Sequence, residues 1–186
     1  MNKTKLFLDY DGCIIDSIKA YCSVYNELYQ FRPNFKRADW SEVEIWDLKD
    51  QCPLVLNCND IFSNYLFFQK CDFICRNTKE VIEKLCEKYE VFICSIGTPE
   101  NIAFKSMWLN EHLPCVKNYI MLVNDGCKMT KAIVDMKDSI FIDDVTSNLD
   151  SSNAKLKIIF GNEYYWSQTK DYTRCFNWTD VEKLLL

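Results

Sequence analysis

The feature that most constrains the fold is an alternation of short apolar runs with segments of helical spacing. Five apolar runs have the length of a strand, and they cover residues 5–8, 91–94, 119–123, 139–142 and 157–160. Parallel strands require a crossover connection, which is usually a helix, and helix-like segments separate the later runs. The pattern therefore predicts an α/β protein built on a Rossmann-like parallel sheet of five strands.

A long segment separates the first run from the second and breaks this rhythm. Residues 16–75 carry apolar side chains at helical rather than strand spacing. A structureless loop of this length inside a compact domain is uncommon. We therefore predict a small helical cap over residues 16–75, inserted after the first strand of a core domain that comprises residues 1–15 and 76–186.

Capping-box spacings mark further helix starts. Ser41 with Glu44 predicts a short helix in the cap, and Thr179 with Glu182 predicts a helix at the C-terminus. A third cap segment, residues 60–69, is rich in aromatic side chains at helical spacing. These assignments fill most of the cap with helix.

The charge balance limits the classes of partner. Lys and Arg number 22 against 27 Asp and Glu, which gives a formal net charge of -5. Nucleic acid binding depends on basic side chains that neutralise phosphates, so a nucleic acid partner is disfavoured. A small anionic substrate held by a metal is compatible with this charge. No apolar run approaches the roughly 20 residues that cross a bilayer, so we expect no membrane partner.

The cysteines indicate a reducing compartment. Eleven cysteines occur at irregular spacing, and the chain begins Met-Asn-Lys-Thr without the pattern of a secretory signal. A zinc cluster is the alternative, but the chain has no C-x-x-C pair and its single histidine, His112, lies far from the closest cysteine pairs. We expect buried free thiols in a cytoplasmic protein.

Two of the predicted strands end in pairs of carboxylates. Asp9 and Asp11 follow the first strand, and Gly12 allows the backbone to turn away so that both face one point. Asp143 and Asp144 follow the fourth strand. Ligands in open parallel sheets bind beyond the carboxyl ends of the strands. If the two strands are neighbours, the four carboxylates converge on one site for a hard cation, and Mg²⁺ suits such oxygen ligands.

Phosphoryl transfer gives this cluster a function. Bound Mg²⁺ would offset the charge of a phosphate ester and orient its phosphorus for attack by Asp9. The reaction then divides into formation of an aspartyl phosphate and its hydrolysis. Asp11 is placed to protonate the leaving group in the first step and to accept a proton from water in the second. The alternative for either carboxylate pair is an acidic turn after a strand, which is a weak explanation for both pairs at once.

Two further positions are candidates for holding the phosphate. Ser95 ends the second strand, where its hydroxyl and nearby backbone N–H groups can bind phosphate oxygens. An ordinary polar turn is the alternative there. A cation should also face the phosphate, and we choose Lys131, just before the fourth strand, over Lys128 and Lys137.

In their order along the chain, these features resemble the four motifs of the haloacid dehalogenase (HAD) superfamily. Within it the chain most resembles the cytosolic type C 5'-nucleotidases, also called 5'(3')-deoxyribonucleotidases. The similar segments are residues 92–95 (F-I-C-S) before a proline, residues 131–134 (K-A-I-V) before residues 141–144 (F-I-D-D), residues 46–48 (W-D-L), and residues 177–178 (N-W).

The resemblance implies a HAD-like core with a small cap, in agreement with the predicted insertion. It implies that Asp9 is the nucleophile and Asp11 the general acid and base. The metal contacts it implies are Asp9, the main-chain carbonyl of Asp11, and Asp144, with Asp143 supporting that shell.

The resemblance also assigns phosphate binding to Ser95, Lys131 and Gly12. The chain departs from the family pattern here, because Ser95 stands where a threonine is common. Lys131 also lies further from the following aspartates than the family pattern has it.

The leading hypothesis is an Mg²⁺-dependent phosphatase acting on 5'- or 3'-monophosphates of nucleosides or deoxynucleosides. Its competitors are a phosphatase for another small ester, such as a sugar phosphate, and a catalytically weak HAD-like binding module. The cap closes over the phosphate and should select the substrate. We expect most aromatic side chains of the cap to pack in its core, with one of them a candidate to stack on a nucleobase. They are Phe35, Trp40, Trp46, Phe62, Tyr65, Phe67 and Phe68. The sequence leaves the oligomeric state open, with a homodimer among the alternatives.

Overall fold

A parallel sheet of six strands forms the centre of the computed structural model, which describes residues 3–124 and 129–186. The strands are β1 (Lys5–Leu8), β2 (Glu90–Gly97), β3 (Asn118–Val123), β4 (Ile140–Asp143), β5 (Leu156–Phe160) and β6 (Thr173–Cys175). Their order is β3-β2-β1-β4-β5-β6, and all neighbours are parallel. The predicted α/β parallel sheet is confirmed, but the predicted number of five strands was wrong.

The sixth strand carries no apolar run. β6 is three residues long and pairs with β5 from Ile158↔Thr173 to Phe160↔Cys175. Because backbone hydrogen bonds form this pairing, the side-chain pattern contains no signal for it. The edge strand therefore escaped the prediction.

Strand β1 lies between β2 and β4, which brings the ends of all three strands together. Leu8 is level with Ile93 of β2 and with Ile142 of β4. The backbone N–H of Asp9 donates to the Ile142 carbonyl at 2.9 Å, so the pairing continues one residue beyond β1. Residues that follow these three strands consequently share one edge of the sheet, where the strand order reverses and ligands bind in such folds.

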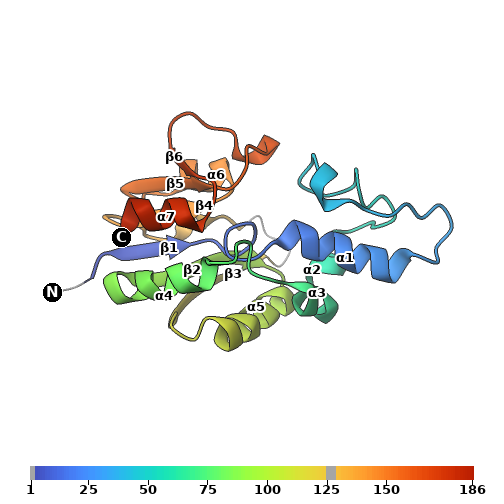
Figure 1. The fold of residues 1–186 in the computed structure, drawn as a ribbon, viewed down its shortest axis with the longest axis horizontal. Coiled ribbons are helices and arrows are strands. Elements are labelled where there is room, and N and C mark those ends of the chain that lie inside the picture. The colour runs from blue at the N-terminus through green and yellow to red at the C-terminus, as the bar shows by residue number, and fades with distance from the viewer. Residues whose placement is uncertain (1–2, 125–128) are drawn as a thin grey trace.

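Helices cover both faces of the sheet (Figure 1). The core helices are α4 (Thr78–Lys88), α5 (Pro99–His112), α6 (Thr146–Ser151) and α7 (Trp178–Leu185). Leu6 and Leu8 point into the larger buried cluster, whereas Phe7 packs on the opposite face with Leu149 of α6. Burial on both faces explains why β1 is a continuous apolar run. Among the described residues, no helix has the length and apolar composition that a membrane crossing requires.

Residues 16–75 are less helical than predicted. They contain α1 (Ser17–Tyr29), α2 (Asn59–Phe62), α3 (Tyr65–Lys70) and a short 3-10 turn, η1 (Trp40–Glu42). In Figure 1 this region extends from the carboxyl end of β1 away from the sheet. A helical cap as such is not established, and the domain boundaries at residues 15 and 75 stay a prediction.

Local side-chain hydrogen bonds explain the missing helix in this region. Asp39 accepts hydrogen bonds from the backbone N–H and the hydroxyl of Ser41, at 2.9 and 2.7 Å, and caps η1. The capping box predicted at Ser41 and Glu44 therefore was wrong, because Ser41 lies inside a turn that ends at Glu42. Asn64 similarly caps α3 and divides the predicted helix over residues 60–69 into α2 and α3.

The C-terminal helix begins two residues earlier than predicted. Asn177, rather than Thr179, caps α7 by accepting from the Asp180 backbone N–H at 3.1 Å. The buried indole of Trp178 donates to the Cys13 carbonyl at 2.8 Å. This bond ties α7 to the loop that follows β1, which carries Asp11 and Gly12. All ten cysteines in the described part of the chain are free thiols, and none is exposed.

Candidate active site

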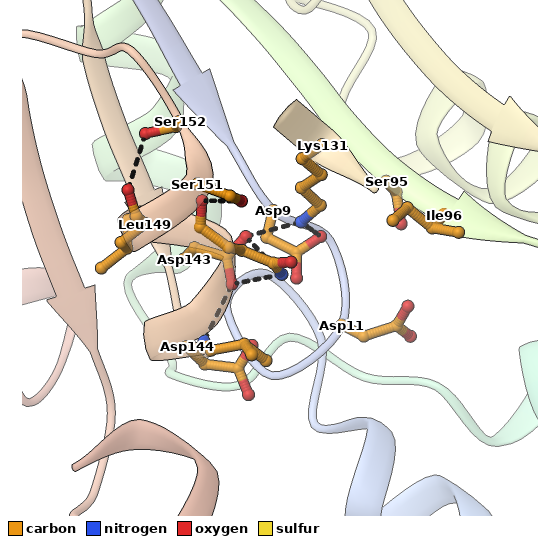
Figure 2. A network of polar contacts seen from close by, with 12 residues as sticks. Asp9, Asp11, Ser95, Ile96, Lys131, Asp143, Asp144, Leu149, Ser151 and Ser152 are labelled. Atoms are coloured by element: carbon orange, nitrogen blue, oxygen red, sulfur yellow. Dashed lines mark hydrogen bonds and ion pairs between the residues drawn. The ribbon is translucent and has the colours of Figure 1, made fainter. Parts of the chain in front are cut away.

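The predicted acidic residues meet at the carboxyl edge of the sheet. Asp9 follows β1, Asp143 is the last residue of β4, and Asp144 follows it. Figure 2 shows Asp9 and Asp143 beside Lys131, Asp144 below Asp143, and Asp11 and Ser95 at the edge of the cluster. Carboxylate oxygens of Asp9, Asp143 and Asp144 all lie within 4.8 Å of one another, and the three residues are buried.

The surroundings of Asp144 suit a metal ligand. Burial, followed by the charges of Asp143 and Asp9, raises the pKa of Asp144 well above its usual range. Its Oδ1 atom is buried without a hydrogen-bond partner among the described residues. Like charges so close together repel unless a proton or a cation lies between them. This set of carboxylate oxygens fits a hard divalent cation such as Mg²⁺, which Asp9 and Asp144 would hold.

Gly12 lies against Asp144. Its φ of 69° is in the left-handed region, and a Cβ added there would meet Oδ2 of Asp144 at 2.6 Å. Any side chain at this position would therefore strain the backbone and displace the carboxylate. Trp166, which the sequence analysis missed, donates from its indole N–H to the same Oδ2 at 3.2 Å.

Lys131 joins the two halves of the acidic cluster. It lies on the 3-10 turn η2 (Lys131–Ile133), and its Nζ is 2.7 Å from Oδ1 of Asp9 and 2.6 Å from Oδ2 of Asp143. Burial favours the neutral amine, but Asp143 and Asp9 outweigh it and raise the pKa of Lys131, so the side chain stays charged. Of the rejected lysines, Lys137 is exposed and Lys128 lies outside the described residues.

Asp143 is held by donors on several sides. Besides Lys131, it accepts from the Asn148 side-chain amide at 3.0 and 3.1 Å and from the Val145 backbone N–H at 2.8 Å. A carboxylate with its lone pairs so occupied has little capacity left for a metal. Its geometry therefore suits a support for Lys131 better than a ligand.

Asp11 and Ser95 are connected by a second buried lysine that the sequence analysis missed. Nζ of Lys105, on α5, contacts Oδ2 of Asp11 and donates to Oγ of Ser95 at 2.9 Å. Lys105 belongs to the buried face of α5 with Asn101 and Trp108, and a charged residue in that helical stripe was the available signal. Burial raises the pKa of Asp11, although Lys105 opposes the shift.

Two cavities adjoin the site, and Trp46 contributes to the lining of each. One, of about 360 Å³, is lined by Asp11, Phe62 and Lys105, among others. The other, of about 280 Å³, is lined by residues that include Gly12 and Asp144. Trp46 lines both cavities and packs edge-on against Trp166, with 5.2 Å between ring centroids. Space for a small organic group thus exists beside both the candidate acid and the candidate metal ligands.

Asp144→Asn should stabilise the metal-free protein and remove its response to Mg²⁺. Replacing a buried, like-charged carboxylate by a neutral amide should raise the melting temperature by about 2–4 °C. Mg²⁺ at 100 times its Kd stabilises a protein that binds it by roughly 2.7 kcal/mol. Saturating Mg²⁺ should therefore raise the melting temperature of the wild type by about 5–10 °C and leave that of the variant unchanged. Thermal unfolding with and without Mg²⁺ measures both effects.

The stabilisation produced by Asp144→Asn should depend on pH in a defined direction. A carboxyl whose pKa is raised by folding stabilises the folded state at low pH, and this contribution is lost as pH rises through the folded-state pKa. The difference in melting temperature between Asp144→Asn and the metal-free wild type should therefore grow between about pH 5 and pH 8. A difference that stayed constant or shrank would contradict the charged cluster.

Comparison with known proteins relates the chain to phosphatases. A family model described as "5' nucleotidase, deoxy (Pyrimidine), cytosolic type C protein" matches residues 2–186. A HAD-superfamily hydrolase of subfamily IA from Geobacter sulfurreducens has 10% identity and a TM-score of 0.65, covering 99% of this chain and 97% of that chain. A haloacid dehalogenase-like hydrolase from Streptococcus pneumoniae has 11% identity and a TM-score of 0.64, covering 99% of both chains. No curated protein matches.

Proposed function

The chain belongs to the family of cytosolic type C 5'-nucleotidases and is a phosphoric monoester hydrolase, and from that premise we propose that it hydrolyses nucleoside or deoxynucleoside monophosphates with Mg²⁺. We further propose that the reaction passes through a phosphorylated Asp9. The family description also supports a cytoplasmic location.

The observation that carries the proposal is the environment of Asp9. Its Oδ1 is 2.7 Å from Nζ of Lys131, and its carboxylate lies within 4.8 Å of an Asp144 oxygen. Asp9 is 6% exposed, so these charges act in a site largely closed to water. A buried nucleophile between a fixed cation and a candidate metal ligand suits attack on an anionic phosphate.

In the proposed first step, an Asp9 carboxylate oxygen attacks phosphorus, and the bond from phosphorus to the ester oxygen breaks. Asp11 donates its proton to that oxygen, so the nucleoside leaves as a neutral alcohol. Bound Mg²⁺ supplies charge neutralisation at the phosphate. Lys131 contacts two acceptors among the described residues, and we assign its third N–H to a phosphate oxygen.

In the second step, water attacks the phosphorus of the aspartyl phosphate. Asp11, now ionised, accepts a proton from that water, and the bond between phosphorus and the Asp9 oxygen breaks. Inorganic phosphate is released, and both aspartates return to their initial states. The raised pKa of Asp11 suits a group that must hold a proton in one step and release it in the next.

Phosphate release from a substrate panel tests the proposal. Purified protein with Mg²⁺ would be incubated with 5'- and 3'-monophosphates of nucleosides and deoxynucleosides and with sugar phosphates, beside an Asp9→Asn control. The highest kcat/KM is expected for a nucleotide. A preference for a sugar phosphate would refute the nucleotide substrate, and no release above the control would refute the enzyme.

A fluoride complex that mimics the phosphoryl group separates an enzyme from a binding module. Beryllium fluoride with Mg²⁺ should raise the melting temperature of the wild type, because it binds the folded site, and should leave Asp9→Asn unchanged. Equal melting temperatures with and without the complex in the wild type would favour a module without a competent nucleophile.

Trp46 is our candidate for contact with the nucleobase, since it lines both cavities and half of its surface is exposed. Stacking on a base contributes about 1–3 kcal/mol, so Trp46→Ala should raise KM for a nucleotide about tenfold. Trp46→Phe, which keeps an aromatic face, should raise it less. Inhibition by inorganic phosphate, which has no base, is the control and should not change. An unchanged KM in Trp46→Ala would exclude this contact.

A further inference from the structure

Lys105 is a buried cation that takes no part in the two chemical steps above. It is 1% exposed and comes from α5, whereas the aspartates that act on the substrate follow β1. Removing an ammonium group from water is costly unless its donors are paired, so a lysine at this depth needs partners. Its partners indicate what it does.

All three N–H donors of Lys105 have an acceptor. Nζ contacts Oδ2 of Asp11, donates to Oγ of Ser95 at 2.9 Å, and donates to the Ile96 carbonyl at 3.1 Å. An ammonium group has three donors and no acceptor, so none remains for a substrate. Lys131 differs, because among the described residues its ammonium group has only two acceptors, Asp9 and Asp143.

The contact with Lys105 leaves the two oxygens of Asp11 in different states. Oδ2 is held by the ammonium group, while Oδ1 is buried without a hydrogen-bond partner among the described residues. Asp11 and Lys105 both line the 360 Å³ cavity beside Trp46. A carboxylate fixed through one oxygen presents the other in a constant direction, as proton transfer to a leaving group requires.

We infer that Lys105 is a positioning residue that fixes the Asp11 carboxylate, through Oδ2, so that Oδ1 faces the oxygen of the leaving group. The inference rests on the proposed function, in which Asp11 protonates that oxygen. The Ile96 carbonyl, on β2, anchors the ammonium group to the sheet. The same ammonium group sets the rotamer of Ser95, so the acid and one side of the phosphate site share a single support.

Two esters whose leaving groups differ in their need for protonation distinguish a positioning role of Lys105 from a general structural role. A nucleotide loses a strongly basic alkoxide and needs the proton from Asp11, whereas p-nitrophenyl phosphate loses a stable anion. General acid catalysis contributes about 10²- to 10⁴-fold, so Lys105→Met should lower kcat/KM for the nucleotide by about 30-fold or more. For p-nitrophenyl phosphate the fall should be less than about threefold. Effects on phosphate binding are common to both esters, so they cancel when the loss in kcat/KM for the nucleotide is divided by the loss for p-nitrophenyl phosphate.

A double variant tests whether Lys105 acts through Asp11. In an Asp11→Asn background, Lys105→Met should lower kcat/KM for the nucleotide by less than about twofold, because the group that it positions is already gone. Lys105→Arg, which keeps the charge, should recover part of the nucleotide rate. If Lys105→Met fails to fold alone, the double variant, which has no unpaired Asp11 carboxylate, and Lys105→Arg still provide the comparison.

The outcomes distinguish this inference from the proposed function. Equal losses on both esters, or additive losses in the double variant, would overturn the positioning role. A wild type that hydrolyses another alkyl phosphate but not nucleotides would refute the nucleotide substrate alone, and the ratio would then be measured on that ester. A wild type without turnover of any phosphate ester would refute both.

Discussion

Asp9→Asn should lower kcat for phosphate-ester hydrolysis by about 10⁴-fold or more, the scale of loss when a covalent nucleophile is removed. The amide keeps the shape of the carboxylate but cannot form the phosphorylated intermediate. It also removes one of the three charges that face the candidate metal position. Release of inorganic phosphate from the best substrate, under saturating Mg²⁺, measures the loss.

The folded state should survive this change. Asp9→Asn reduces repulsion in the Asp9, Asp143 and Asp144 cluster, and Lys131 keeps its contact with Asp143 at 2.6 Å. Circular dichroism and the melting temperature of the metal-free protein should therefore match or exceed those of the wild type. Residual activity above about one per cent, with the fold intact, would assign the nucleophile to another residue.

Lys131→Met should lower both stability and activity. The change leaves Asp9 and Asp143 buried without the cation that contacts both, and breaking a buried ion pair from one side costs about 3–5 kcal/mol. We expect a fall in melting temperature of about 10 °C. Loss of a cation that faces the phosphate should lower kcat/KM by about 10²- to 10³-fold, measured well below the melting temperature.

Lys137→Met is the matched control for this variant. Lys137 lies six residues along the same connection to β4 but is exposed, so its removal should change stability by no more than about 0.5 kcal/mol. Activity should also be unchanged. If Lys131→Met behaved like this control, Lys131 would support neither Asp9 nor the phosphate.

The sheet could be predicted from sequence wherever burial on two faces produced a continuous apolar run. Phe7 and Leu8 of β1 show this, because they point to opposite faces and both are buried. β6 was missed because its pairing depends on the backbone. The helix expected after Ser41 was wrong because Asp39, outside the capping box, closes a shorter turn.

The same distinction explains which site residues could be predicted. Asp9 and Asp143 stand directly at the ends of apolar strands, so the sheet brings them together once the strand order is known. Lys105 and Trp166 reach the site from a helix and a loop, and Lys105 is separated from Asp11 by 94 residues. Such contacts depend on how distant elements pack, and a local pattern does not contain that information.

Trapping the phosphorylated enzyme tests the central claim most directly. The protein would be mixed with the best substrate carrying a radioactive phosphoryl group and quenched in acid within milliseconds, and the labelled peptide would then be identified by mass spectrometry. We expect the phosphoryl group on Asp9, in an amount that falls as phosphate is released, and no label in Asp9→Asn. Hydrolysis that proceeds without a labelled Asp9, or with the label on another residue, would contradict the account.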